Sequence, residues 1–365
     1  MHVPFIDLKR EWNYFEKKMV SAFKKFGKRG VYVLGNDVEQ FENNFAAYCG
    51  YPYAISVSTG LAALAIALRA HGITDDNEVI TVGNSAVATS LAIAETGAKP
   101  VFCDIGNDFL IDTNKIENLI TKKTKAIVPV HLFGKTCDMV AINTIAKKHH
   151  LVIIEDACQA HGADFKGVSA RHTKAFSFYP TKNLGAWGEG GMIVTRDKEI
   201  KEFAASYRNY GQHGRYNHVM RGTNARLEPL HCALLGVKLQ QLDKFITQRQ
   251  KIAKNYITAL KNLKFLAINN FDLTHAYHLF VIRVLNGKRD ALQQYLLKNG
   301  IESLIHYPMA IHKQPCFTRE GKTARVPVTD QYQKEILSLP CYPFLKTTEQ
   351  QYIIDHLKHF AETNG

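Results

Sequence analysis

The sequence predicts an α/β protein with a large domain built on a mostly parallel sheet, followed by a smaller α+β domain. From residue 50 to about 200, short apolar runs alternate with apolar-periodic segments of helical length, which is typical of parallel strands joined by helices. The length of 365 residues is more than one domain usually holds. Hydrophobic residues at 46% and charged residues at 22% are typical of a globular protein and exclude a disordered one.

The elements of the large domain are expected in a regular order. Strands are expected at 54–57, 78–82, 99–103, 126–130, 151–155 and 192–195. Helices are expected at 61–72, 86–96, 142–149 and 198–207. Gly72 and Gly97 end the first two helices, because glycine readily adopts the backbone conformation found at a helix end. Helices are expected to cover both faces of the sheet.

The last third of the chain shows a different pattern. A long helix is expected at 229–260, then a strand at 277–284 and helices at 288–299 and 348–363. We therefore place the large domain at 1–245 and the small domain at 246–365. We also expect the N-terminal segment to pack on the small domain.

Charge and composition argue against several classes of protein. The net charge of +13 comes from small basic clusters among acidic and apolar residues, which fits an enzyme with a phosphorylated substrate better than a nucleic-acid-binding protein. No apolar run is long enough to span a membrane, and the start, MHVPFIDLKREW, lacks the apolar stretch of a signal peptide, so we expect a cytoplasmic protein. The seven cysteines lack metal-ligand spacing, which predicts free thiols and no metal site.

The candidate chemistry lies at the ends of the predicted strands, where ligands of open parallel sheets bind. The segment SVSTGLAAL at 56–64 places hydroxyls and Gly60 at a strand-to-helix turn, where free amides bind phosphate, although serine and threonine are also ordinary helix caps. A buried strand ends in Glu155 and Asp156, and a carboxylate there needs a cation, either a protonated pyridine nitrogen or a structural lysine or arginine. Gln159 can reach a ring oxygen of the same ligand, and His161 fits a buried core position equally well.

Two later segments add further candidates. FSFYPTKNLG at 176–185 holds Lys182 among apolar residues, where a lysine loses part of its preference for charge, although an exposed loop lysine is the simpler interpretation of this segment alone. In GTNARL at 222–227, Asn224 can donate to a phosphate and Arg226 can pair with a carboxylate, or both can simply precede a helix. A phosphate-binding turn, an aspartate and a nucleophilic lysine together predict pyridoxal phosphate (PLP) as a cofactor.

The motifs STGLAAL, EDACQAHGA, FSFYPTKNLGAWGEGG, RNYG, NARLEPLHCALL and IHYP, in this order, resemble the DegT/DnrJ group of sugar-nucleotide aminotransferases, which are PLP enzymes of fold type I. The resemblance runs from VPFIDLKREW to SLPCYPFL and implies a seven-stranded, mostly parallel sheet. It also implies that Lys182 binds PLP covalently, that Asp156 pairs with the pyridine nitrogen, and that Gln159 contacts the ring hydroxyl.

The resemblance implies further site residues and a homodimer. Ser177 and the amides of Gly60 and Leu61 would hold the phosphate, and Asn224 would complete that site from the neighbouring subunit. The sugar-nucleotide side would be lined by His306, Tyr307, Arg226 and Tyr179.

The implied activity is transfer of the amino group of L-glutamate to a nucleotide-linked keto-deoxysugar. The GLxAL form resembles members that act on dTDP-3-keto-6-deoxyhexoses, and a 4-keto acceptor is the alternative. Ala86 stands where the family usually stacks an aromatic residue on the cofactor ring, and Leu61 stands where many relatives have threonine. These two departures leave open a catalytically silent regulatory protein that binds PLP or a sugar nucleotide, although Lys182 and Asp156 argue against it.

Overall fold

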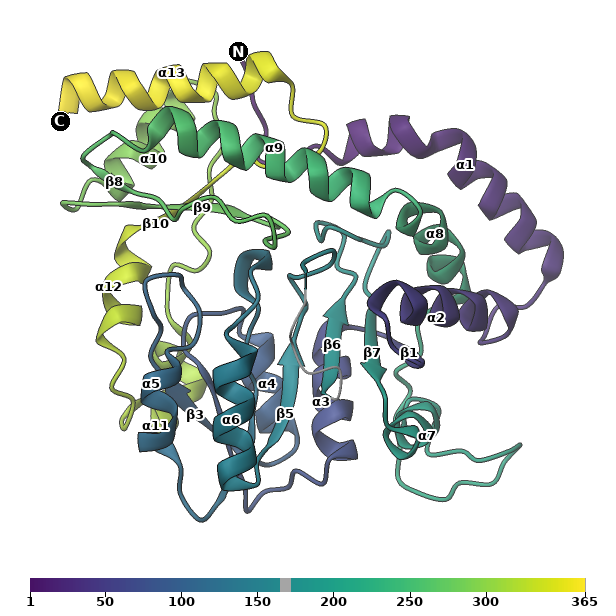
Figure 1. The fold of residues 1–365 in the computed structure, drawn as a ribbon. Coiled ribbons are helices and arrows are strands. Elements are labelled where there is room, and N and C mark those ends of the chain that lie inside the picture. Colours follow the sequence, from purple (N-terminus) through teal and green to yellow (C-terminus); the bar gives the residue numbers. More distant parts are fainter. Residues whose placement is uncertain (165–171, 365) are drawn as a thin grey trace.

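A seven-stranded sheet forms the centre of the computed structural model, which describes residues 1–164 and 172–364 (Figure 1). Its strands are β1 (Tyr53–Val57), β2 (Glu78–Val82), β3 (Lys99–Cys103), β4 (Thr124–Ile127), β5 (Val152–Asp156), β6 (Thr173–Ser177) and β7 (Gly191–Thr195). Their order across the sheet is β1-β7-β6-β5-β4-β2-β3. Strand β7 is antiparallel to both of its neighbours and the other pairs are parallel, so the sheet is mostly parallel, as predicted.

Helices cover this sheet, which explains why its central strands are buried along almost their whole length. The helices between the strands are α3 (Gly60–Ala70), α4 (Ala88–Glu95), α5 (Thr113–Ile116) and α6 (Met139–His149), and α7 (Lys198–Tyr207) follows the last strand. Strand β6 was not predicted. It contains Lys174, and a charged residue inside a five-residue strand hides the apolar run that periodicity detects.

The first 50 residues form two helices that carried no prediction, α1 (Leu8–Arg29) and α2 (Asn36–Cys49). Both pack on α8 (Pro229–Leu239) at one end of the sheet (Figure 1). Helix α1 buries mainly Phe15, Met19 and Phe26 and leaves several other apolar residues exposed, among them Trp12 and Phe23.

The single long helix expected at 229–260 is wrong, because the chain breaks it at Gln240 and Gln241 into α8 and α9 (Leu242–Leu260). Helix α8 packs Leu235 into the core of the large sheet. Helix α9 begins in the same core with Leu242 and continues into a second core, where Tyr256 is buried.

The second core surrounds a small antiparallel sheet in the order β10-β9-β8. Its strands are β8 (Leu266–Ala267), β9 (Phe280–Val284) and β10 (Ile336–Leu339), and the helices of this part are α10 (Arg289–Lys298), α11 (Thr318–Gly321), α12 (Pro327–Glu335) and α13 (Thr347–Asn364). Four 3₁₀ turns are η1 (Glu117–Leu119), η2 (Leu132–Gly134), η3 (Ile311–Lys313) and η4 (Pro315–Phe317). Val3 forms a parallel bridge with Ile301 and is fully buried in the same core. Helix α9 runs through residue 245 without a break. The domain boundary placed at this residue stays a prediction.

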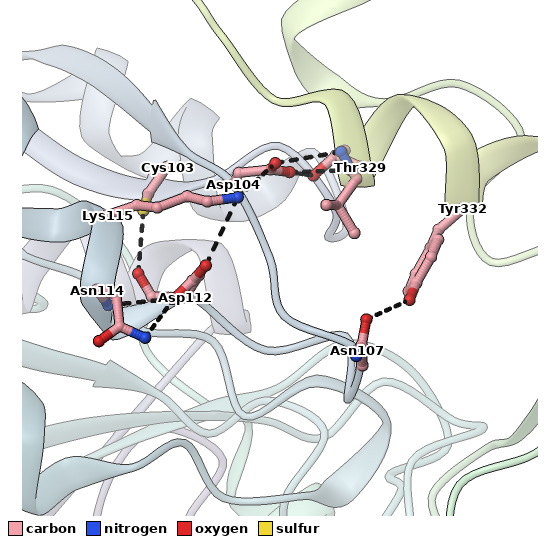
Figure 2. Close-up of polar contacts among 9 residues, drawn as sticks. Cys103, Asp104, Asn107, Asp112, Asn114, Lys115, Thr329 and Tyr332 are labelled. Atoms are coloured by element: carbon pink, nitrogen blue, oxygen red, sulfur yellow. Dashed lines mark hydrogen bonds and ion pairs between the residues drawn. The ribbon is translucent and has the colours of Figure 1, made fainter.

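Helix α12 is held onto the large sheet by Asp104, the residue after β3 (Figure 2). The first residues of α12 have no side-chain cap of their own. The Asp104 carboxylate accepts hydrogen bonds from the backbone N–H groups of Val328 (3.1 Å) and Thr329 (2.9 Å) and from the Thr329 hydroxyl (3.0 Å). Lys115 Nζ lies 3.0 Å from the same carboxylate. An acidic residue 225 positions away in the sequence therefore caps this helix.

Among the described helices, none combines the length and apolar character that a membrane crossing requires. All seven cysteines are free thiols.

Candidate active site

A cavity of ≈ 620 Å³ opens at the carboxyl ends of the parallel strands. It brings together ten of the residues predicted from the sequence: Gly60, Leu61, Ala86, Asp156, Gln159, Ser177, Tyr179, Lys182, His306 and Tyr307. These residues come from five separate segments of the chain, and His306 and Tyr307 belong to the part that carries the small sheet. The cavity therefore lies between the two sheets.

Asp156 ends strand β5 inside this cavity, and two hydrogen bonds fix its carboxylate. The Thr89 hydroxyl donates to Oδ2 at 2.7 Å, and the N–H of Cys158 donates to Oδ1 at 3.1 Å. Asp156 is only 4% exposed. Even so, no cationic side chain of residues 1–164 and 172–364 lies within ion-pair distance of its carboxylate. A buried carboxylate without a cation fits a protonated ring nitrogen of a ligand.

The neighbouring Glu155 points to the other face of the sheet, because successive strand residues alternate. It pairs with Lys174, which lies directly opposite it on β6, while Asp156 lies opposite the small Ala175. His131 Nε2 and His172 Nδ1 also contact this carboxylate, at 2.8 and 3.0 Å. Of the two partners considered from the sequence, the structural lysine pairs with Glu155, and among the described residues no cationic side chain pairs with Asp156.

Lys182 follows a tight turn in which its N–H donates to the carbonyl of Tyr179 at 2.9 Å. Gly185 allows this turn, because a Cβ at that position would lie 2.2 Å from the carbonyl oxygen of Pro180. Burial lowers the pKa of the Lys182 amine, and the nearby Cys158 and Asp156 only partly oppose that shift. A larger neutral fraction makes the amine a better nucleophile and base.

The turn between β1 and α3 has the close contacts expected of a phosphate site. Thr59 caps α3 by accepting from the N–H of Ala62 at 2.9 Å, and the first amides of a helix have no partner within the helix. Ser177 ends β6 beside them. A Cβ on Gly60 would lie 2.6 Å from the Cβ of Ser177, so only glycine fits there.

The side chain of Gln159 is held from two sides. Its Oε1 accepts from the N–H of Phe133 at 2.9 Å and its Nε2 donates to the hydroxyl of Tyr307 at 3.1 Å. One amide hydrogen stays available for a ligand oxygen. Ala86 contributes only a methyl group to the cavity wall, so that position offers no ring for stacking.

Three predicted residues lie outside the cavity. Asn224 is exposed and forms an isolated antiparallel β-bridge with Asn209. Arg226 donates to the Asn209 side chain at 2.6 Å and lies over the ring of Tyr210. His161 is buried against Phe176 and Phe178, and burial, with a contribution from Lys182, lowers its pKa to about 3. It is therefore a neutral histidine in the core rather than a residue of the cavity wall.

Sequence reasoning missed Thr89, which orients Asp156, and His278, which lines the cavity with its pKa lowered mainly by burial. Thr89 had a usable signal, because it follows the end of another predicted parallel strand. His278 had none, because only the packing of the two sheets brings it to the site.

The chain is similar to known proteins over almost its whole length. The model of the DegT/DnrJ/EryC1/StrS aminotransferase family matches residues 13–358. The dTDP-3-amino-3,6-dideoxy-alpha-D-galactopyranose transaminase of Aneurinibacillus thermoaerophilus is 41% identical, over 98% of this chain and 99% of that protein. A "pleiotropic regulatory protein" of Geobacillus stearothermophilus is 39% identical, over 99% of this chain and 100% of that protein. Among solved structures, S. venezuelae DesV is similar with a TM-score of 0.95 and 36% identity, over 99% of both chains.

Proposed function

From the premise that the chain belongs to the DegT/DnrJ/EryC1/StrS aminotransferase family, we propose that it transfers the amino group of L-glutamate to C3 of a dTDP-3-keto-6-deoxyhexose. The enzyme is a PLP-dependent aminotransferase. One observation carries the proposal: a lysine with a lowered pKa and a buried carboxylate without a cation share one cavity. Among common cofactors, PLP needs this pair.

The residues present fit the cofactor. When bound, PLP supplies an electron sink next to the carbon that loses or gains the amino group. Asp156, held by Thr89, keeps a proton on the ring nitrogen. Lys182 is the covalent attachment point, and its Nζ removes the α-proton of the donor and later returns a proton to the sugar carbon.

The phosphate of the cofactor is assigned to the turn at the start of α3. The amides of Gly60 and Leu61 and the hydroxyl of Ser177 would bind its oxygens. Gln159 would donate its free amide hydrogen to the ring hydroxyl. His306, Tyr307 and Tyr179 are assigned to the sugar-nucleotide side of the cavity.

We assign C3 as the position of amination by analogy with relatives. The A. thermoaerophilus relative and a 37% identical Streptomyces venezuelae relative are both named as transaminases of 3-amino dTDP-sugars. Amination at C4 is the alternative within the same reaction class.

The proposal includes a homodimer with shared sites, located in the cytoplasm. Asn224 and Arg226 lie outside the cavity of their own chain, so they can serve the site of a second copy. Next to the Lys182 turn, Trp12 and Trp187 are 38% and 49% exposed, with ring centroids 5.3 Å apart. Exposed rings of this size on a monomer favour a protein interface.

A regulatory role is the second candidate, because the G. stearothermophilus relative is named for one and Ala86 removes a stacking ring. Such a protein would bind PLP without turnover. The intact Lys182 and Asp156 favour the enzyme.

The test is a visible absorbance spectrum of the protein with PLP, recorded before and after excess L-glutamate. We expect the band of the bound cofactor to bleach and 2-oxoglutarate to form, with Lys182→Ala as the inactive control. A bound cofactor that does not react with glutamate would refute the proposal, and one that reacts with no amino donor at all would support the regulatory role. Supplying 3-keto and 4-keto dTDP-sugars to the aminated enzyme then decides the position.

A further inference from the structure

A second cavity, of ≈ 270 Å³, adjoins the catalytic cavity. Five residues line both cavities: Tyr179, Thr181, His278, Leu279 and His306. Tyr179 and Thr181 lie within three residues of Lys182, so the second cavity begins beside the reactive amine. Its remaining wall is mostly apolar and consists of Phe5, Ile6, Leu304, Leu339, Cys341, Tyr342 and one cation, Arg249.

Arg249 is buried, with only 4% of its surface exposed. Its Nη1 donates to the backbone carbonyls of Tyr277 and His278, both at 3.2 Å, and to that of Cys341. Its Nε is buried without a hydrogen-bond partner in the described chain. The backbone carbonyls therefore hold the guanidinium through Nη1, while its Nε–H has no acceptor in the described chain.

Within residues 1–164 and 172–364, no carboxylate lies within ion-pair distance of Arg249. Arg10, near the same end of the molecule, shows the usual arrangement, because it pairs with Glu349 at 2.6 Å and with Asp7 at 3.0 Å. A buried cation without an anion is costly, and neutral carbonyls offset only part of that cost. An anionic ligand would supply the missing partner.

Resting on the function proposed above, we propose that Arg249 binds the side-chain carboxylate of L-glutamate. The apolar wall suits the two methylene groups of this donor, and Arg249 is the cation of the same cavity. The α-amino group would then lie in the adjoining catalytic cavity, near Lys182. Arg249 is thus a specificity residue for the donor, and the same site accepts 2-oxoglutarate when the reaction is reversed.

The first measurement compares L-glutamate with L-glutamine, which has nearly the same shape but no side-chain charge. Arg249→Met should lower the ratio of kcat/KM for glutamate to that for glutamine by about 100-fold, as truncation of a buried charge partner does. Arg10→Met is the matched control, because its cation is already paired within the protein, and it should leave this ratio unchanged.

The second measurement is independent of turnover. Glutarate, which has two carboxylates and no amino group, is titrated into the protein by calorimetry, and dTDP is titrated in parallel. Arg249→Met should weaken glutarate binding by at least about tenfold, which corresponds to about 1.4 kcal/mol of binding free energy. The binding of dTDP should be unchanged. Unchanged glutarate binding by a variant that still binds dTDP would overturn the proposal.

If Arg249→Met does not fold, Leu304→Trp decides the question. Leu304 lines the second cavity but not the catalytic one and is 45% exposed, so tryptophan there narrows the second cavity while Arg249 itself is retained. We expect a higher KM for glutamate and weaker glutarate binding, and no change in either would overturn the proposal. A wild-type protein that never reacts with glutamate would instead refute the proposed function, so the two failures are distinguishable.

Discussion

Replacing Asp104 by alanine tests whether a distant carboxylate holds helix α12 in place. The substitution removes the acceptor of two backbone N–H groups and one hydroxyl, all inside the protein (Figure 2). A lost helix cap costs about 0.5–2 kcal/mol, and hydrogen bonds to a charged group cost about 1.5–3 kcal/mol each when lost. The ion pair with Lys115 adds at most about 1 kcal/mol, because that lysine is 40% exposed.

The two backbone bonds make up the cap and the hydroxyl bond adds to it, so the predicted loss in the free energy of unfolding is about 2–5 kcal/mol. The assay is urea unfolding at a fixed PLP concentration, in which the free energies of unfolding of the wild type and the variant are compared at the midpoint of the transition. Lys115→Met, which removes the ion pairs with Asp104 and Asp112 and leaves the cap intact, is the matched control and should cost less than about 1 kcal/mol. A loss below about 1 kcal/mol for Asp104→Ala, or an equal loss for both variants, would refute the capping argument.

The effect of Asp104 should also depend on pH. Burial by itself raises the pKa of this carboxyl, but hydrogen bonds from Thr329, Lys115 and Val328 outweigh burial and lower the pKa below its usual value. The folded-state pKa is thus below the unfolded one, so the stabilisation is complete above the unfolded pKa, about 3.9, and is lost as the pH falls through the folded pKa. The stability difference between wild type and Asp104→Ala should therefore shrink below about pH 4, and a constant difference down to the acid transition would contradict this assignment.

The remaining predictions concern the active site. Lys182→Ala should abolish the reaction with glutamate and leave the unfolding midpoint unchanged; measurable turnover would contradict the assignment. Asp156→Ala should bind PLP weakly and be nearly inert, and Thr89→Val, which removes one hydrogen bond to that carboxylate, should lower kcat by about tenfold; normal rates in Asp156→Ala would refute its role. Co-expressed Lys182→Ala and Asn224→Ala chains should regain about a quarter of the wild-type sites, because half of the dimers are mixed and each mixed dimer keeps one intact shared site. No recovery, with mixed dimers present by mass, would exclude shared sites.

The large sheet and much of its site could be predicted because their signals are local. A parallel strand buried on both faces is an apolar run, and the apolar residues of the helix after it recur about every 3.6 residues, so a short stretch of sequence indicates each element. Ligands bind at the carboxyl ends of such strands, which pointed to Gly60, Asp156 and the segment around Lys182 without any knowledge of packing. The order of the motifs then indicated the family that the comparisons show.

Only the tertiary structure decided which charges are paired. Glu155 and Asp156 are neighbours in sequence, yet the register of β5 against β6 places Lys174 beside Glu155 and leaves Asp156 opposite the uncharged Ala175. The same holds for Arg249, whose place beside the catalytic cavity depends on how α9 crosses between two cores. The physical reason is that periodicity records the surroundings of a segment, whereas a charge is paired or unpaired by atoms within a few ångströms, and these come from residues far away in the chain.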